Sequence, residues 1–383
     1  MSSVTAPAAV GDRSGGLSAT IQEGIAAARA GDRLGTVRIA LQQVGFGLIP
    51  LIVLCALLAS VLASHSEAVD FRNAYYVAAH RLLHGANPYA WSPAQLRAGI
   101  AFVYPAFSAL AFTPFALLSK TTASVIFTLI CVALAPLSLS VLGVRDWRIY
   151  GITLIWLPVF GAWQTANETI LLVLATALVW RHRERPLVAG VITAAAISLK
   201  PFVWPLALWL LATRRWRAAG VAAVAGLTIN LLSWWLLGFG NIATFLHDSA
   251  LDASFAWRAG YSIVAAAGHL GLGRGAGEIL MVLSALALAL AVLHAGLVQA
   301  DQRRALILAV ALMLAASPLV WSHYFALLLV PMALMRPRVG ALWALPLLMW
   351  VCPPSFSVSA WQAAVAWAVS LTIFAQTLRR AGG

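Results

Sequence analysis

Long apolar runs recur along nearly the whole chain, and short polar segments separate them. The first run extends from Ile39 to about Ser64, which is long enough to cross a bilayer as one helix. Further apolar segments lie at 103–119, 121–142, 149–162, 168–180, 187–199, 201–213, 218–238, 261–273, 278–299, 305–319, 323–335, 339–351 and 358–377. The pattern predicts an all-α, polytopic membrane protein.

The polar segment after the first run has a helical period of its own. Phe71, Tyr75, Ala78 and Leu82 recur at i, i+4, i+7 and i+11, which places them on one face of a helix. Gly85 follows as a typical C-terminal stop. We therefore predict an amphipathic helix that lies on the outer membrane surface and does not cross it.

The basic residues report how the chain is oriented. Its 383 residues carry a net charge of +13, and 62% of them are hydrophobic. Most arginines after the first run form small clusters between apolar segments: Arg145 and Arg148, Arg181 to Arg185, Arg214 to Arg217, Arg303 and Arg304, Arg336 and Arg338, and Arg379 and Arg380. This is the positive-inside pattern of membrane proteins, so the charge does not indicate a nucleic-acid partner.

The clusters also predict the topology. If all of them are cytoplasmic, both termini lie inside and about 12 segments cross, with 103–119 and 261–273 failing to cross fully. We expect a single transmembrane domain over residues 37–380 in the cytoplasmic membrane, after a flexible cytoplasmic tail at 1–36. The parts that then face outside are Gln164, Lys200, the loop 239–260, His323 and Pro353-Pro354.

Asp70 is the strongest catalytic candidate in this pattern. The chain has only 12 acidic residues, and this one stands just beyond the first span, at the head of the predicted amphipathic helix. A carboxylate in that place is a candidate general base. The alternative is that Asp70 serves as a helix N-cap, a position that Asp favours.

Three further polar residues interrupt apolar sequence on the predicted outer side. Lys200 stands inside an apolar stretch, where a charge by default marks a functional site, here a phosphate contact. Gln164 and Glu168 precede a span. The alternatives are a snorkelling lysine at a span end and polar residues that cap or link helices.

Four other side chains are candidates for binding a substrate. His323, in Ser322-His323-Tyr324, is either a ligand for substrate or a packing residue. Arg258 and Arg274 lie against the positive-inside trend, where they would hold an anionic lipid phosphate or remain solvated. Tyr104 would line a groove for sugar or lipid, although aromatic residues also anchor membrane interfaces.

The sequence lacks the motifs of several common cofactor-binding and catalytic sites. It has no Walker loop, dinucleotide fingerprint, zinc motif or nucleophile elbow. We therefore expect that no metal or cofactor is required. A site on the outer face has no access to nucleotide-activated sugars or ATP, so a group donor there would be borne by a lipid.

An ordered set of motifs resembles glycosyltransferase family 87. The motifs are Asp70-Phe71-x-x-x-Tyr75, Gly85-x-Asn87-Pro88-Tyr89, Phe102-Val103-Tyr104-Pro105, Ser198-Leu199-Lys200-Pro201 with the later Arg214-Arg215-Trp216-Arg217, and Ser322-His323-Tyr324. The similarity runs over most of residues 38 to 380. Two differences, Tyr104-Pro105-Ala106 for Tyr-Pro-Pro and Trp163-Gln164 for Gly-Gln, bear on the donor sugar more than on the reaction class.

The resemblance implies a GT-C fold and an inverting transferase that uses a polyprenyl-phosphate sugar. Mannose would be the first expectation for the sugar and arabinofuranose the second, with a glycolipid or polysaccharide as acceptor. The acidic residue of the first outer loop, here Asp70, would be the catalytic base, and Tyr75 of the same motif would contact substrate. A polysaccharide ligase or polymerase, and a lipid or sugar transporter, remain as alternatives.

Overall fold

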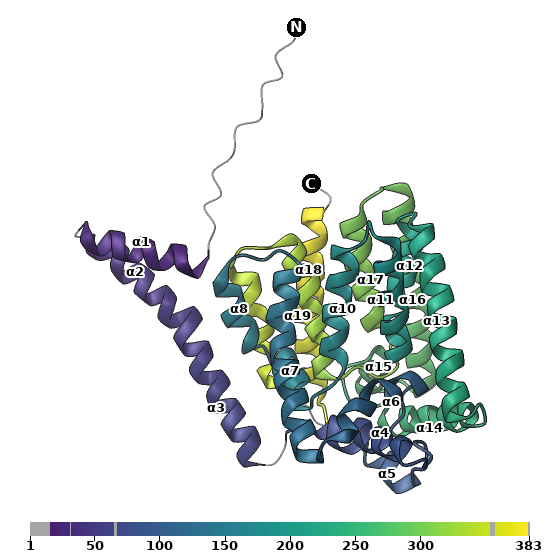
Figure 1. Cartoon of the computed structure of the whole chain (residues 1–383). Helices are drawn as coiled ribbons and strands as arrows, with labels where there is room; N and C mark the ends of the chain where they lie inside the picture. Colours follow the sequence, from purple (N-terminus) through teal and green to yellow (C-terminus); the bar gives the residue numbers. More distant parts are fainter. Residues whose placement is uncertain (1–15, 31, 65–66, 353–356, 382–383) are drawn as a thin grey trace.

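The computed structural model describes residues 16–30, 32–64, 67–352 and 357–381, and its regular structure in these ranges is entirely helical (Figure 1). The predicted all-α class is therefore confirmed. Pro353-Pro354, expected on the outer side, lies outside the described residues.

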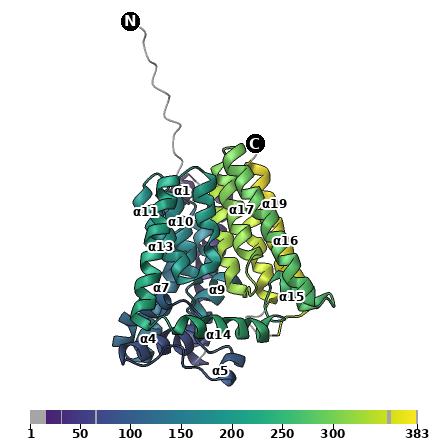
Figure 2. The ribbon, with the colours of Figure 1, turned by 90° about the vertical axis from the view of Figure 1, so that its right-hand side faces the viewer.

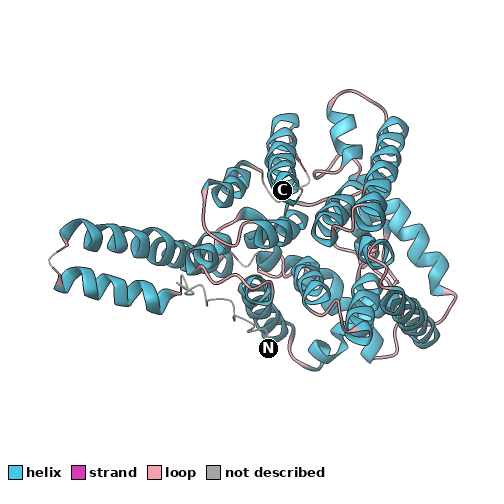
Figure 3. Ribbon diagram, turned by 90° about the horizontal axis from the view of Figure 1, so that it is seen from above, coloured by secondary structure: helices cyan, strands magenta, loops and turns pink. Residues whose placement is uncertain are grey.

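The N-terminal arm consists of α1 (Leu17–Arg29), α2 (Arg33–Gln43) and α3 (Ile49–Ala63), with a π-helical turn between the last two. From Arg33 to Ala63 the chain is one apolar helix long enough to cross a membrane, in agreement with the predicted first span. Figures 1 and 3 show this arm projecting from the side of the bundle. Helix α1 falls within the segment 1–36 for which we predicted a flexible tail.

The segment after the first span forms a helix, as its periodicity predicts. A π-helical turn (Phe71–Tyr75) continues into α4 (Tyr76–Leu83), and Gly85, at φ +71°, follows its end. Phe71 is fully buried and stacks on Phe127 of α7 (Lys120–Val141), with 4.9 Å between ring centroids. The apolar face of this helix therefore packs on the bundle.

The remaining helices form the bundle, with 3₁₀ segments where prolines or polar breaks interrupt it. The α-helices are α5 (Pro93–Arg97), α6 (Ala106–Phe112), α8 (Trp147–Leu154), α9 (Leu157–Gln164), α10 (Thr169–Arg181), α11 (Pro186–Leu199), α12 (Pro205–Ala212), α13 (Trp216–Leu237), α14 (Asn241–Ala256), α15 (Ile263–His269), α16 (Arg274–Leu293), α17 (Gln302–Ala315), α18 (Leu329–Met335) and α19 (Ala360–Ala381). The 3₁₀ segments are Thr113–Leu117, Pro201–Val203, Ser322–Leu328 and Ala341–Val351, and a π-turn covers His294–Val298.

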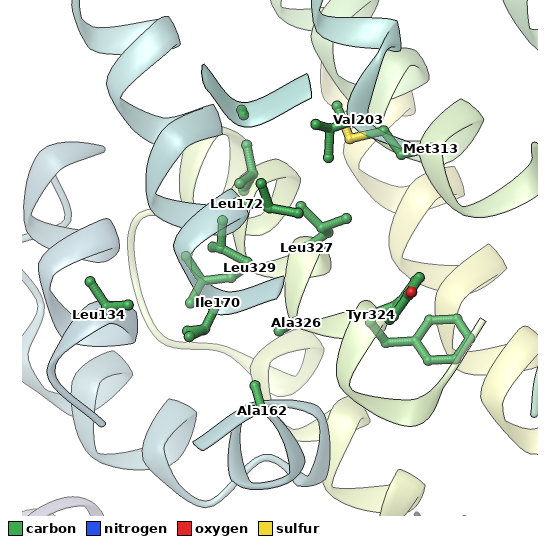
Figure 4. Packing of buried hydrophobic residues seen from close by; sticks show 14 of the residues in the cluster. Leu134, Ala162, Ile170, Leu172, Val203, Met313, Tyr324, Ala326, Leu327 and Leu329 are labelled. Carbon is green, nitrogen blue, oxygen red and sulfur yellow. The ribbon is translucent and has the colours of Figure 1, made fainter. Parts of the chain in front are cut away.

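The centre of the bundle is a continuous apolar core. Ile170 and Leu172 of α10 lie beside Ala326, Leu327 and Leu329, which belong to the Ser322–Leu328 segment and α18 (Figure 4). All five side chains are almost completely buried. This packing connects α10, near the middle of the chain, to the segment that contains His323.

Helix lengths establish fewer crossings than the hydropathy pattern predicts. Four helices are long and apolar enough to span a membrane, or five if α9 and α10, bent by 117° at their break, count as one span. Several other apolar segments form helices of 10–17 residues. The segments 103–119 and 261–273, expected not to cross, contain only α6 with a 3₁₀ turn and α15. The helix lengths therefore account for four or five of the about 12 expected crossings, and the remaining crossings stay a prediction from charge and hydropathy.

Several arginine clusters gather at one end of the bundle, which we call the arginine end. Arg215 donates hydrogen bonds to Glu184 (2.5 Å) and Gln302 (3.0 Å), which lie in two other inter-helix segments. Asp146 pairs with Arg148 and accepts a hydrogen bond from the backbone of Val339. Figures 1 and 2 show α4, α5 and α14 at the opposite end, which we call the site end.

The segment 239–260 is not the loop that we expected, because most of it forms helix α14. This helix runs across the site end between α4 and α15 (Figure 2). Just after it, Gly260 has φ +76°, and a Cβ there would lie 2.5 Å from the carbonyl oxygen of Val320. Tyr261 donates a backbone hydrogen bond to the same oxygen (2.6 Å). The end of α14 is therefore fixed close to the segment that carries His323.

Candidate functional site

A cavity of about 130 Å³ lies at the site end. Five parts of the chain line it: residues near Asp70, several residues of 99–104, the break between α9 and α10, Asp252 of α14, and residues 321–323. Asp70 and His323 therefore share one cavity although 252 residues lie between them in the sequence.

The break between α9 and α10 provides the platform on which Asp70 is placed. Ala68 donates a backbone hydrogen bond to the carbonyl oxygen of Gln164 (2.6 Å), and Asp70 donates one to that of Thr165 (3.1 Å). Ala68 and Ala166 both adopt left-handed φ values, +54° and +48°, which are uncommon for residues other than glycine. Such strain often accompanies a functional constraint.

The carboxylate of Asp70 points to this break and does not cap a helix. Its backbone is already helical (φ −67°, ψ −43°), and the side chain makes no capping hydrogen bond. Instead, Asn167 donates its amide Nδ2 to Asp70 Oδ2 at 2.7 Å. The N-cap alternative is therefore not supported. Burial raises the pKa of the Asp70 carboxyl, although the hydrogen bond from Asn167 and the charge of Lys200 act in the opposite direction.

Asn167 connects the two charged candidates. Its Oδ1 accepts hydrogen bonds from the backbone N–H of Thr169 (2.9 Å) and from Lys200 Nζ (3.2 Å). A backbone N–H is always a donor, so this contact fixes which amide atom is the oxygen. The amide nitrogen is thereby directed toward Asp70, and Asn167 forms a bridge between the carboxylate and the lysine.

Lys200 is buried in protein behind the cavity wall, with 6% of its surface exposed. Its Nζ lies 3.9 Å from Glu168 Oε1 and 4.5 Å from the centre of the Tyr324 ring. Glu168 is fully buried and accepts a hydrogen bond from Ser108 Oγ (3.0 Å). A snorkelling lysine would extend toward lipid or water, and this one does not. Neither Lys200 nor Glu168 lines the cavity itself.

Ser322 and His323 bring unused hydrogen-bonding capacity to the cavity. Both residues are about 95% buried or more and line it. Ser322 Oγ and His323 Nε2 have no hydrogen-bond partner among the described residues. Buried polar atoms are nearly always paired, so an unpaired set beside a cavity is explained well by a bound ligand.

The other predicted binding residues separate into two groups. Tyr104 lines the cavity, and Tyr75 lies directly behind it, 4.7 Å away between ring centroids and 3.5 Å from Asn167 through its hydroxyl. Gln164 contributes its backbone to the platform. By contrast, Arg258 is exposed and lies over the ring of Trp257, and Arg274 pairs with Glu278 at 2.7 Å. The structure does not bring these two arginines to the cavity.

Sequence reasoning missed four polar or aromatic residues that line the cavity: Asn73, Thr165, Trp321 and Asp252. Asp252 carried a usable signal, because acidic residues are rare in this chain and this one lies on the expected outer side. Asn167 lies between the candidates Gln164 and Glu168 in the sequence, but its bridging role depends on the fold. Across the described ranges, no three His, Cys, Asp or Glu side chains gather in a way that could hold a metal ion.

Comparison with known proteins gives one match. The family model of glycosyltransferase family 87 matches residues 102–318, more than half of the chain. No curated protein and no solved structure matches the sequence significantly. The matched region includes Lys200, Asn167 and Asp252, whereas Asp70 and His323 lie on either side of it.

Proposed function

Because the chain belongs to glycosyltransferase family 87, we propose that it transfers a sugar from a polyprenyl-phosphate donor to a lipid or glycan acceptor. The reaction takes place at the outer face of the cytoplasmic membrane, with mannose as the first expectation and arabinofuranose as the second. The observation that carries this proposal is the position of Asp70, in a cavity and linked through Asn167 to a buried lysine.

Asp70 is the general base of the proposed reaction. The acceptor hydroxyl attacks the anomeric carbon of the donor sugar, and its proton passes to the Asp70 carboxylate. The bond between that carbon and the phosphate oxygen breaks, the polyprenyl phosphate leaves with the electron pair, and the configuration inverts. Asn167 holds one carboxylate oxygen, which orients the base. General-base catalysis of this kind contributes about 10²–10⁴-fold.

In this proposal the phosphate of the donor binds at Ser322 and His323. Their unpaired polar atoms are available to bind phosphate oxygens, and the charge of Lys200 lies just behind the wall. Fixed dipoles and cations near a leaving phosphate favour the transition state. On this basis Lys200→Ala should raise the apparent KM for the lipid donor more than that for the acceptor.

An apolar groove beside the site suits the lipid part of the donor. It has a volume of about 490 Å³ and is lined by α6, α7, α10 and α11. One lining residue, Phe112, stacks on Tyr75 at 4.8 Å, and another, Leu199, directly precedes Lys200. A polyprenyl chain in this groove would therefore place its phosphate end near Lys200.

We also propose the GT-C architecture with about 12 crossings and the arginine end in the cytoplasm. Single cysteines near Arg183, Arg215 or Arg336, in a variant without the native cysteines, should be protected from an impermeant thiol reagent in intact cells. Cysteines near Asn87 or Ser249 should react. Reversed accessibility would place the cavity in the cytoplasm and remove the argument for a lipid-borne donor.

The decisive test of the reaction is Asp70→Asn. Purified protein is incubated with radiolabelled decaprenyl-phosphate mannose, or separately with decaprenyl-phosphate arabinose, and with membrane lipids as acceptor. The variant should fold normally and lose at least about 10²-fold in transfer, because Asn cannot accept the proton.

Glu67→Gln is the matched control, since Glu67 precedes Asp70 by three residues, pairs with Arg72 and does not line the cavity. It should retain transfer. Wild-type-like turnover of Asp70→Asn would contradict the assignment of Asp70 as the base. A wild-type protein that moves labelled donor across vesicles without forming product would favour the transporter alternative.

A further inference from the structure

Helix α14 places a second carboxylate, that of Asp252, in the wall of the same cavity. Asp252 is half-buried, and within the described parts of the chain no hydrogen bond or ion pair to its carboxylate is found. Burial raises the pKa of its carboxyl to about 6. Asp70, in the same cavity, already has Asn167 as a partner. The two carboxylates therefore differ in whether protein groups satisfy them.

The position of Asp252 is set by contacts on either side of it along α14. One turn earlier, Ser249 donates a hydrogen bond to the carbonyl oxygen of Val103 (3.4 Å). One turn later, Phe255 lies under the guanidinium of Arg97, 5.2 Å from its ring centre. Ala256, on the inner side of the helix, is buried. These contacts hold α14 against the 97–103 segment, so the Asp252 carboxylate is fixed above the cavity.

An aromatic side chain accompanies Asp252. Trp321 lines the cavity next to Ser322, on the segment to which the end of α14 is bound through Val320. An indole ring offers an apolar surface, and a carboxylate accepts two hydrogen bonds from neighbouring donors. A sugar ring has an apolar face and neighbouring hydroxyl donors. A phosphate group offers neither and would be repelled by the carboxylate.

We propose that Asp252 and Trp321 form the subsite for the acceptor sugar, in which Asp252 accepts hydrogen bonds from hydroxyls adjacent to the one that attacks. The ligand class is a neutral pyranose with vicinal hydroxyl groups. This inference rests on the proposed function, since the attacking hydroxyl must lie at Asp70. Asp252 is a binding residue here and takes no proton from the reacting hydroxyl.

The experiment measures binding before it measures transfer. Binding of radiolabelled octyl α-D-mannopyranoside to the whole protein is followed by equilibrium dialysis, without donor, in a detergent that has no sugar headgroup. The wild type should bind saturably, and Asp252→Asn should bind about 10–100-fold more weakly, because hydrogen bonds to a charged group are lost. Asp248→Asn, one turn earlier on α14 and outside the cavity lining, should bind as the wild type does.

Monodeoxy versions of the same mannoside separate recognition from a merely structural effect. One hydroxyl of the mannoside donates a hydrogen bond to Asp252. Its removal should weaken binding to the wild type by about the same factor as Asp252→Asn does, and should leave binding to Asp252→Asn nearly unchanged. Equal weakening in both proteins would overturn the proposal, as would absence of saturable binding or unchanged binding by Asp252→Asn.

Failure of the acceptor subsite can be told apart from failure of the proposed transferase function. If the wild type binds the mannoside as expected but transfers no sugar from any polyprenyl-phosphate donor, the proposed function fails and the subsite stands. If transfer proceeds while Asp252→Asn leaves the acceptor KM unchanged, the subsite fails and the proposed function stands.

Discussion

The two ends of the bundle use charged residues in opposite ways. At the arginine end, Glu184 pairs with Arg215 at 2.5 Å, and its side chain is 74% exposed. At the site end, Glu168 and Lys200 lie 3.9 Å apart with side chains 0% and 7% exposed. An exposed ion pair contributes little to stability, whereas a buried one pays a large desolvation cost.

Under the proposed function, this difference separates charges that orient the protein in the membrane from charges that take part in the reaction. At the arginine end, Arg215 has partners besides Glu184, since it also donates hydrogen bonds to the carbonyl oxygen of Arg183 and to Gln302. At the site end, Lys200, Asn167 and Asp70 form one connected chain. A costly buried group is retained where it has a function, which fits the default interpretation of an ionisable residue in an apolar environment.

Among charge substitutions at the two ends, removal of the buried cation Lys200 should have the largest effect on stability. Lys200→Met leaves Glu168 buried without its partner, so the free energy of unfolding should fall by about 3–5 kcal/mol. Transfer should fall as well, because the positive charge behind the proposed phosphate site is lost. Thermal unfolding in detergent and donor kinetics measure the two effects.

The double variant Lys200→Met with Glu168→Gln distinguishes the two roles of the lysine. Since no unpaired charge remains, most of the lost stability should return while donor KM stays high. Recovery of both stability and transfer would show that Lys200 serves packing alone. Loss of stability as great as in the single variant would contradict the pairing with Glu168.

The extent to which the sequence predicts this molecule depends on how far apart the interacting residues lie. The first span, the helix at Phe71–Leu83 and its stop at Gly85 follow from local spacing and backbone preference, and the structure contains all three. The prediction of a loop at 239–260 was wrong, because the segment contains helix α14 and its polar residues give no clear helical pattern. Local pattern does not specify a helix whose buried face is as narrow as this one.

The site itself was only partly accessible from sequence. Asp70 and Lys200 stood out because charge is rare in apolar surroundings. Their connection through Asn167 depends on the strained turn at Ala166, and no period or motif predicts that turn. Arg258 and Arg274 also stood out by charge, yet their partners are Trp257 and Glu278. Rarity identifies candidates, and only the fold selects among them.

The pH dependence of transfer tests the role of Asp70 at the site end, and its expected effect is smaller than that of Lys200→Met. Asp70 must be ionised to accept a proton, and burial raises its pKa above the ordinary 3.8. The rate should therefore fall about tenfold per pH unit as pH drops below that raised pKa. The profile is measured in Asp252→Asn, because the Asp252 carboxyl itself has a pKa of about 6.

Asn167→Ala provides the control for this profile. Its loss removes a hydrogen bond that lowers the pKa of Asp70, so the acid limb should move to higher pH. A limb that stays in place, or moves to lower pH, would exclude Asp70 as the group that titrates.

The smallest expected effect is at the arginine end. Glu184→Gln removes the carboxylate that pairs with Arg215 and lies 3.6 Å from Arg183, but Arg215 keeps its hydrogen bonds to Gln302 and to the carbonyl oxygen of Arg183. Since Glu184 is largely exposed, the free energy of unfolding should change by less than about 1 kcal/mol, and transfer should be unaffected. Thermal unfolding at low and high salt measures this, and any small loss should shrink in high salt because exposed charges are screened. A loss as large as that of Lys200→Met would mean that burial does not distinguish the two ends, and the separation between orienting and acting charges would fail.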